Sequence, residues 1–443
     1  MLTALIVGAW LIPLALATMA VVGYLRGRKL RTAYAREMII QITTIGNQES
    51  VNAIVAAIRG YDLRFPYRIW IVTEPRSSSG YEGADRVIVV PADFKCRASY
   101  KCRALEYVRR LRAREGLTDR HLKILFLDDD SLPSQGYIEK SFHADHDICQ
   151  GIIIPRTSYG RLLSHMDNLR TLNCVVFCSV FQGFGHPIQV HGEGLCVRAS
   201  TEQVVTWDHP VVASEDLVFG QMAAHKGVDW GFFYDFVYIT SPWTFRDYLK
   251  QRRRWLWGNI HAIRFVLPRA AKGRLIIKWV LGFGGYIVAT AGVLLDRLGY
   301  LEIPADLRPV LAVSLIAFLG SFAVSGWVNG AGRVSQTVAS VVLAFLTCGF
   351  SVFVLLAGLI RGDPRRFEVI QKLAGGPQAA AGSRRSIRRP STRFGAIAAT
   401  TFGVGLFVAM IFTAYLDRIG LDVSAGQPSA VVIQRVFPET PGK

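Results

Sequence analysis

The residues Lys123-Ile-Leu-Phe-Leu-Asp-Asp-Asp-Ser131 form the most informative stretch of this chain. Four consecutive apolar residues, 124–127, are typical of a strand that is buried on both faces of a parallel sheet. The strand leads directly into Asp128, Asp129 and Asp130. Ligands of open α/β sheets bind at the carboxyl ends of strands, so these three acids lie where a site is expected.

The side chains of an extended segment alternate, which predicts that Asp128 and Asp130 point one way and Asp129 the other. Two carboxylates on one side are suitable ligands for a hard divalent cation that leaves room for phosphate oxygens. The alternative is a polar strand end in which Asp129 or Asp130 caps the following turn. The residues downstream favour the metal site.

Composition indicates a membrane protein with two or three domains, because the 443 residues are 51% hydrophobic and their mean hydropathy is +0.28. The net charge of +18 suits nucleic acid, an anionic bilayer or phosphorylated substrates. Many basic residues adjoin apolar segments, which favours a membrane surface. The seven cysteines show no Cys-x-x-Cys spacing, so we interpret them as reduced core thiols rather than zinc ligands.

The first 25 residues are almost all apolar and long enough to span a bilayer. The basic residues follow this segment, in 26–31, whereas a signal peptide carries them before its apolar core. We therefore expect a retained transmembrane helix at 1–25, with the chain after it in the cytoplasm.

Residues 36–258 have the pattern of a soluble α/β domain, in which strands alternate with helices. The predicted strands are 38–45, 67–73, 86–91 and 124–127, and the predicted helices are 50–60 and 100–114. Glu74 follows the second strand at the same sheet edge as the aspartates, where it either contacts a nucleotide or is a solvated loop acid. Lys101 and Arg103 lie near a helix N-terminus, where they either bind a diphosphate or form a solvated helix face.

Two further acidic motifs follow. His191-Gly-Glu-Gly-Leu195 carries a glutamate between glycines, which we expect to be flexible. Ser214 is a predicted N-cap, which would place Glu215 and Asp216 in the first turn of a helix. Helix capping alone explains these acids, and a general base beside a sugar hydroxyl is the other interpretation.

The stretch 241–258 reads Ser-Pro-Trp-Thr-Phe-Arg-Asp-Tyr-Leu-Lys-Gln-Arg-Arg-Arg-Trp-Leu-Trp-Gly. Its arginines suit a membrane-surface anchor, but the flanking glutamine and tryptophans are unusual for one. Asp-x-Asp at 128–130, Glu-Asp at 215–216 and Gln-x-x-Arg-Trp at 251–255 together resemble the membrane-integrated family 2 glycosyltransferases, such as cellulose, chitin and hyaluronan synthases. The residues of the Glu-Asp motif and of the stretch from Ser241 to Trp255 are most similar to those of the egghead-type β-1,4-mannosyltransferases. The resemblance covers about residues 38–258.

The resemblance implies an α/β GT-A-like, Rossmann-like mixed sheet in a cytosolic domain, followed by an α-helical transmembrane region. It implies that Asp128 and Asp130 hold Mg²⁺ or Mn²⁺, and that Asp216, beside Glu215, deprotonates the acceptor. Trp255 would stack on a sugar ring. The implied donor, diphosphate and acceptor contacts are Thr44, Glu74, Lys101, Arg103, Asp128, Gln251, Arg254 and Trp255. Many family members have an Asp after the second strand, where this chain has Glu74, and an Asn-Glu pair after the first strand, where it has Gly46-Asn-Gln-Glu49. Both differences concern nucleotide recognition, so the resemblance leaves the identity of the donor open.

The C-terminal part combines apolar segments with basic ones. We expect an interfacial helix at 259–274, spanning or re-entrant helices within 275–360, a basic cytosolic loop at 361–393, a span at 394–416 and a tail at 417–443. The candidate spans are 275–295, 309–328 and 338–360. Three crossings in 275–360 would leave the basic loop outside, so we expect one of these segments to be re-entrant or interfacial.

The sequence therefore predicts an inverting glycosyltransferase in the inner (plasma) membrane, with a cytoplasmic catalytic domain and contacts to membrane lipids. Its substrates would be a UDP- or GDP-sugar donor and a growing polysaccharide or a lipid-linked acceptor. A synthase-like polymer product is the first expectation, and single sugar addition to a glycolipid is the alternative. A transporter would need ionisable residues inside its spans, and a nucleic-acid-binding protein a readable basic motif; the sequence shows neither.

Overall fold

The computed structural model describes residues 2–27, 30–77, 79–156, 161–242 and 244–364. Eight strands in this part of the chain form one mixed sheet, in the order β3-β2-β1-β4-β7-β6-β8-β5. The strands are β1 (Glu37–Thr43), β2 (Tyr67–Thr73), β3 (Arg86–Val89), β4 (Leu122–Asp128), β5 (Leu132–Pro133), β6 (Ile148–Arg156), β7 (Leu195–Arg198) and β8 (Trp230–Thr240).

Alternation along the buried strands produces a core on each face of the sheet. On β4, Ile124 and Phe126 face one core and Leu125 and Leu127 the other. The first core is covered by α3 (Tyr100–Arg114), α8 (Ala199–Val205) and α9 (Glu215–His225), and the second by α2 (Gln48–Arg59) and α4 (Gln135–His143). Burial on both faces explains the continuous apolar run of β4.

The predicted elements of the first half are present. The bounds of β2 and α3 match the expected ones, whereas β1 ends at Thr43 and β3 at Val89. The strands β3, β2, β1 and β4 are parallel, and β7 then pairs antiparallel with both β4 and β6. The predicted mixed α/β sheet of the GT-A type is thereby confirmed.

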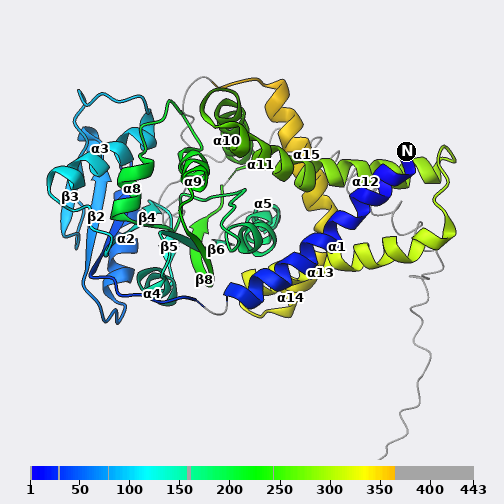
Figure 1. The fold of residues 1–443 in the computed structure, drawn as a ribbon, viewed down its shortest axis with the longest axis horizontal. Helices are drawn as coiled ribbons and strands as arrows, with labels where there is room; N and C mark the ends of the chain where they lie inside the picture. The colour runs from blue at the N-terminus through cyan, green and yellow to red at the C-terminus, as the bar shows by residue number, and fades with distance from the viewer. Residues whose placement is uncertain (1, 28–29, 78, 157–160, 243, 365–443) are drawn as a thin grey trace, which may run out of the picture.

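Long apolar helices extend from this domain. The segments Thr3–Leu25, Arg269–Asp296 and Pro309–Asn329 are each long and apolar enough to cross a membrane. They belong to α1 (Leu2–Gly27), to α11 (Arg269–Trp279) with α12 (Gly285–Arg297), and to α13 (Arg308–Asn329). Figure 1 shows the sheet at one end of the molecule and α1, α12 and α13 at the other.

Three predicted boundaries in this region need correction. Residues 259–274 are not one helix, because α10 (Phe245–His261) and a π-helical turn, Ala262–Val266, precede a break at Pro268. The apolar helix that follows starts at Arg269 rather than 275. The segment 338–360 is divided into α14 (Val334–Val342) and α15 (Ala344–Ile360), which are bent by 56°. The predicted span 394–416, the tail 417–443 and most of the loop 361–393 lie outside the described residues.

Candidate active site

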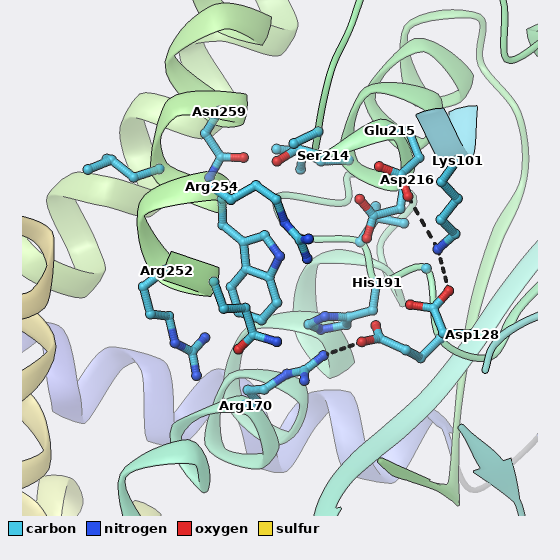
Figure 2. Close-up of a pocket in the computed structure, with 18 of the residues that line it drawn as sticks. Lys101, Asp128, Arg170, His191, Ser214, Glu215, Asp216, Arg252, Arg254 and Asn259 are labelled. Carbon is cyan, nitrogen blue, oxygen red and sulfur yellow. Dashed lines mark hydrogen bonds and ion pairs between the residues drawn. The ribbon is translucent and has the colours of Figure 1, made fainter. Parts of the chain in front are cut away.

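The parallel strands β1, β2 and β4 bring their carboxyl ends to one edge of the sheet, where Thr44, Glu74 and Asp128 follow or end them. These residues line a cavity of about 830 Å³. The predicted site residues that line it are Thr44, Glu74, Lys101, Asp128, Asp130, Glu215, Asp216, Gln251, Arg254 and Trp255. Figure 2 shows how side chains from several elements face one another across it.

The three aspartates after β4 have different partners. Asp128 forms an ion pair with Lys101. The Oδ2 of Asp129 accepts a hydrogen bond from the Thr44 hydroxyl at 2.9 Å, and the Oδ2 of Asp130 accepts one from the backbone N–H of Thr240 at 3.2 Å. The predicted strict alternation does not hold, since Asp129 lines the cavity as well. Because β4 ends at Asp128, the two following residues lie in a turn rather than in a strand.

Lys101, in the first turn of α3, connects the strand acids to the helix acids. Its ammonium contacts Asp128 and lies 3.2 Å from a carboxylate oxygen of Glu215. Burial opposes its charge, but Asp128, Glu215 and Asp216 raise its pKa well above the usual range. Lys101 is therefore a fixed cation beside the predicted base and the predicted metal ligands.

Arg103 does not reach the cavity wall, although Glu74, its partner at 3.2 Å, does. Its guanidinium also donates to the carbonyl oxygens of Pro91, Ala92 and Phe94. These contacts give Arg103 a structural role between α3 and the loop after β3, so it is not part of the site proposed below.

Asp216 lies in the first turn of α9, as predicted, and lines the cavity. Ser214 precedes the helix, but its backbone is left-handed (φ 62°) and its side chain makes no capping hydrogen bond. The pKa of Asp216 rises to about 7, because burial and the neighbouring Glu215 disfavour its charged form while Lys101 opposes them. A carboxyl group with this pKa is suited to accept a proton near neutral pH.

The helix α10 closes the opposite wall with Gln251, Arg254 and Trp255. The guanidinium groups of Arg170 and Arg252 lie 5.1 and 4.5 Å from the Trp255 ring centroid, within cation–π distance. These arginines hold the indole in place. Stacking of Trp255 on a sugar ring remains a prediction.

Sequence reasoning missed a buried ion pair between Arg170 and Glu193, whose atoms approach to 2.6 Å. The two residues line the cavity together with His191. The motif around Glu193 was expected to be flexible, but Glu193 is buried. Burial raises the pKa of Glu193, but Arg170 and His191 outweigh this effect and lower the pKa below its usual range. A Cβ on Gly192 would lie 2.9 Å from the Lys101 Nζ, so a glycine here allows the loop to approach the cation. Nothing in the local pattern around Arg170 pairs it with Glu193.

A second cavity, of about 190 Å³, adjoins the first. It lies among α1, α12, α13 and α15, and its lining is mostly apolar. The two cavities share Leu169, Asn173, Lys278, Phe283 and Ser351. A cavity that contains many charged side chains therefore continues into a more apolar one between the long helices.

One cavity thus joins the strand-end carboxylates of the mixed sheet to Asp216 and α10. Residues 123–360, more than half of the chain, match the model described as Glycosyl transferase family group 2. The chain belongs to this family.

The chain is similar to curated β-1,4-mannosyltransferases. It is 27% identical over 230 residues to egh of Drosophila melanogaster, covering 48% of this chain and 50% of egh. It is 26% identical over 217 residues to bre-3 of Caenorhabditis elegans, covering 46% of each. The chain thus spans about half the length of the curated relatives it matches. The predicted resemblance to egghead-type enzymes is confirmed.

Among solved structures, the chain is similar to the mannosyltransferase PcManGT from Pyrobaculum calidifontis in complex with GDP-Man and Mn²⁺. The TM-score is 0.41 and the identity 13%, over 78% of this chain and 99% of that one.

Proposed function

We propose that this glycosyltransferase transfers one sugar, with inversion, from a nucleoside diphosphate donor to a lipid-linked acceptor. The observation that carries the reaction type is the half-buried Asp216, whose pKa is about 7, in a cavity that also holds Asp128, Asp130 and Lys101. The acceptor oxygen attacks the anomeric carbon, its proton passes to Asp216, and the bond to the diphosphate breaks. A single displacement of this kind inverts the anomeric configuration.

The donor set at the end of β4 fits a divalent cation. The pKa of Asp128 is raised by burial and by repulsion from Glu193 and Asp130, with Lys101 opposing, which indicates that carboxylates crowd together there. Carboxylate oxygens are the ligands that Mg²⁺ and Mn²⁺ prefer, so Asp128 and Asp130 would hold the ion. The bound ion would offset the charge of the leaving diphosphate. Lys101, and Arg254 from the opposite wall of the cavity, would add fixed positive charge.

Mannose is the sugar we propose, because the curated relatives named above are β-1,4-mannosyltransferases. The GDP-Man complex is a property of the archaeal protein, and the donor nucleotide of this chain is left to the experiment below. The residues nearest to a nucleotide at the ends of β1 and β2 would be Thr44 and Glu74, which both line the cavity.

The adjoining apolar cavity favours a lipid-linked acceptor over a polysaccharide. Its wall includes Trp10, Phe177, Phe322 and Phe345, which suit acyl or isoprenyl chains. A polymer channel needs polar groups for sugar hydroxyls along its length, and the apolar lining provides few. The acceptor's sugar would lie beside Asp216 and its lipid tail between the helices.

This arrangement requires a membrane. Three described helices are apolar enough to cross one, and the basic residues of 26–31 follow the first at once. We place the protein in the inner (plasma) membrane with the catalytic cavity on the cytoplasmic side, in keeping with the positive-inside rule.

The test combines a donor panel with a cavity-filling variant. Purified full-length protein is incubated with labelled GDP- and UDP-sugars and a glycolipid extract, and the product size is measured. We expect transfer from a mannose donor and one added sugar per acceptor. A ladder of growing products would overturn single addition and support the polysaccharide alternative.

Ala289→Trp on α12 should raise the KM for the lipid acceptor severalfold, because Ala289 lines the apolar cavity. The donor KM should not change. Ala291→Trp is the matched control, since Ala291 is exposed on the same helix. Equal effects of the two substitutions would rule out the apolar cavity as the acceptor's lipid site.

A further inference from the structure

A buried group of sulfur and nitrogen ligands lies beside the active site and has no part in the proposed reaction. Cys174 and Cys178 begin and end a π-helical turn, and His191 precedes the Gly192 loop. Their ligand atoms all lie within 4.8 Å of one another, and the three residues are buried. π-Helical turns occur frequently at functional sites, because they place side chains in register for a ligand.

The distances match tetrahedral metal coordination. The His191 Nε2 lies 3.4 Å from the Cys174 Sγ and 3.5 Å from the Cys178 Sγ. A tetrahedral zinc ion with Zn–S of about 2.3 Å and Zn–N of about 2.05 Å separates sulfur from nitrogen by about 3.5 Å. Both sulfur–nitrogen separations are therefore the ones that a shared tetrahedral ion requires.

Gln189, beside His191, would supply the fourth ligand. Its amide nitrogen lies 3.3 Å from the His191 Nε2, while its Oε1 is inaccessible to water and has no hydrogen-bond partner in the described residues. The two ends of an amide are interchangeable by a rotation of the side chain, which places the oxygen toward the histidine instead. Oxygen and nitrogen ligands of a tetrahedral zinc ion are about 3.4 Å apart.

The charges of the group also favour a cation. The three residues are buried, where two thiolates without a cation would be costly, and a divalent ion neutralises both. Thiolates together with imidazole are the ligands that select zinc.

We propose that Cys174, Cys178 and His191, with the Gln189 amide oxygen, form a structural zinc site. The four ligands fill a tetrahedral shell, which leaves no position for substrate. The ion would tie the loop that contains His191 to the helical segment before it. Since a Cβ on Gly192 would lie 3.7 Å from that of Asp216, this loop adjoins the proposed base, and zinc would fix its position.

The test measures zinc rather than sugar transfer. Full-length protein is purified in detergent with a strong reductant, from cells grown with added zinc, and metal is determined by mass spectrometry. We expect about one zinc per chain in the wild type. The double variant C174S/C178S should retain less than a tenth of it.

Two matched variants establish whether the bound zinc belongs to this cluster. The variant C149S/C196S removes another buried cysteine pair, which has no histidine beside it to complete a metal site among the described residues, and should keep its zinc. Asp128→Ala should also keep it, so that loss of the proposed catalytic metal is distinguished from loss of zinc. When the bound zinc of the wild-type protein is replaced by Co²⁺, absorption from charge transfer between thiolate and Co²⁺ should appear. This result does not depend on how well the variants fold.

Three results would overturn the proposal. These are a wild-type protein without zinc under these conditions, a C174S/C178S protein with its zinc unchanged, and a Cys174–Cys178 disulfide that forms in place of metal binding.

Discussion

At the scale of single residues, the site depends on the balance between Lys101 and the acids around it. Lys101 contacts Asp128 and Glu215, and its charge favours the ionised form of Asp216. Burial and Glu215 act in the opposite direction and bring the pKa of Asp216 to about 7. This balance should determine both the turnover rate and its dependence on pH.

Asp216→Asn should lower kcat by about 10²–10⁴-fold, the usual contribution of a positioned base, and leave the donor Kd nearly unchanged. In the wild type, the pKa of Asp216 is raised to about 7, and Asp216 acts as a base only when it is deprotonated. The value of kcat/KM should therefore increase with pH up to about 7 and then level off. Stopped assays across pH and donor titrations provide both values. A loss of donor affinity with unchanged turnover would identify Asp216 as a helix cap instead.

Lys101→Met should shift the rising limb of this pH profile to higher pH, because the cation that lowers the pKa of Asp216 is removed. Lys140→Met is the control, since Lys140 pairs with Asp235 and lies outside the cavity lining. An unshifted limb in the Lys101 variant would contradict the electrostatic coupling of the two residues.

At the scale of elements, the site requires α10 to pack closely against the start of α9. A Cβ on Gly258 of α10 would lie 2.6 Å from the Ser214 Oγ and 3.0 Å from the Ala213 carbonyl oxygen. The absence of a side chain at Gly258 therefore permits the approach of Gln251 and Arg254 to Asp216 across the cavity.

Gly258→Ala should lower the melting temperature and reduce kcat about tenfold or more, because overpacking costs about 1–3 kcal/mol and shifts one helix. Gly273→Ala in α11 is the control: nothing lies within 4 Å of its added Cβ, and alanine favours helix. Thermal melts and initial rates test both variants. Equal behaviour of the two would show that the close packing is unnecessary.

At the scale of the whole molecule, both ends of the bent pair α14–α15 lie against the sheet-bearing part of the chain. Before α14, the Asn329 side chain accepts a hydrogen bond from Thr171 at 2.7 Å. After α15, Gly362 accepts one from Arg253 of α10 at 2.8 Å, and Asp363 pairs with His261 at 3.1 Å. Figure 1 shows α15 next to α10. We therefore predict that α14–α15 does not cross the membrane.

Impermeant maleimide labelling of Val334→Cys and Arg361→Cys should give the same sidedness, that of the catalytic domain. Tyr300→Cys, between α12 and α13, should label from the opposite side; Tyr300 is 79% exposed. Wild-type protein provides the background from native cysteines. Agreement of Arg361→Cys with Tyr300→Cys would mean that the bent pair spans the bilayer.

The sequence determined the elements and the chemistry that belong to short segments. The apolar run of β4, the aspartates that end and follow it, and the first-turn acids of α9 were all predicted from short segments, and the structure contains them. The predicted cap itself is not formed, because the Ser214 side chain makes no capping hydrogen bond. The parallel strands then had to bring Thr44, Glu74 and Asp128 to one edge, because the carboxyl ends of parallel strands lie together.

Tertiary structure alone decided the contacts between distant residues. Arg170 and Glu193 pair across 23 positions, Arg103 is held by backbone carbonyls away from the cavity, and His191 reaches Cys174 and Cys178 from another loop. The cysteine pattern predicted reduced core thiols, and the seven cysteines are free, five of them buried. The approach of His191 to two of them lies beyond the reach of any local motif. Such pairings arise from the packing of whole elements, and no periodicity within one segment encodes them.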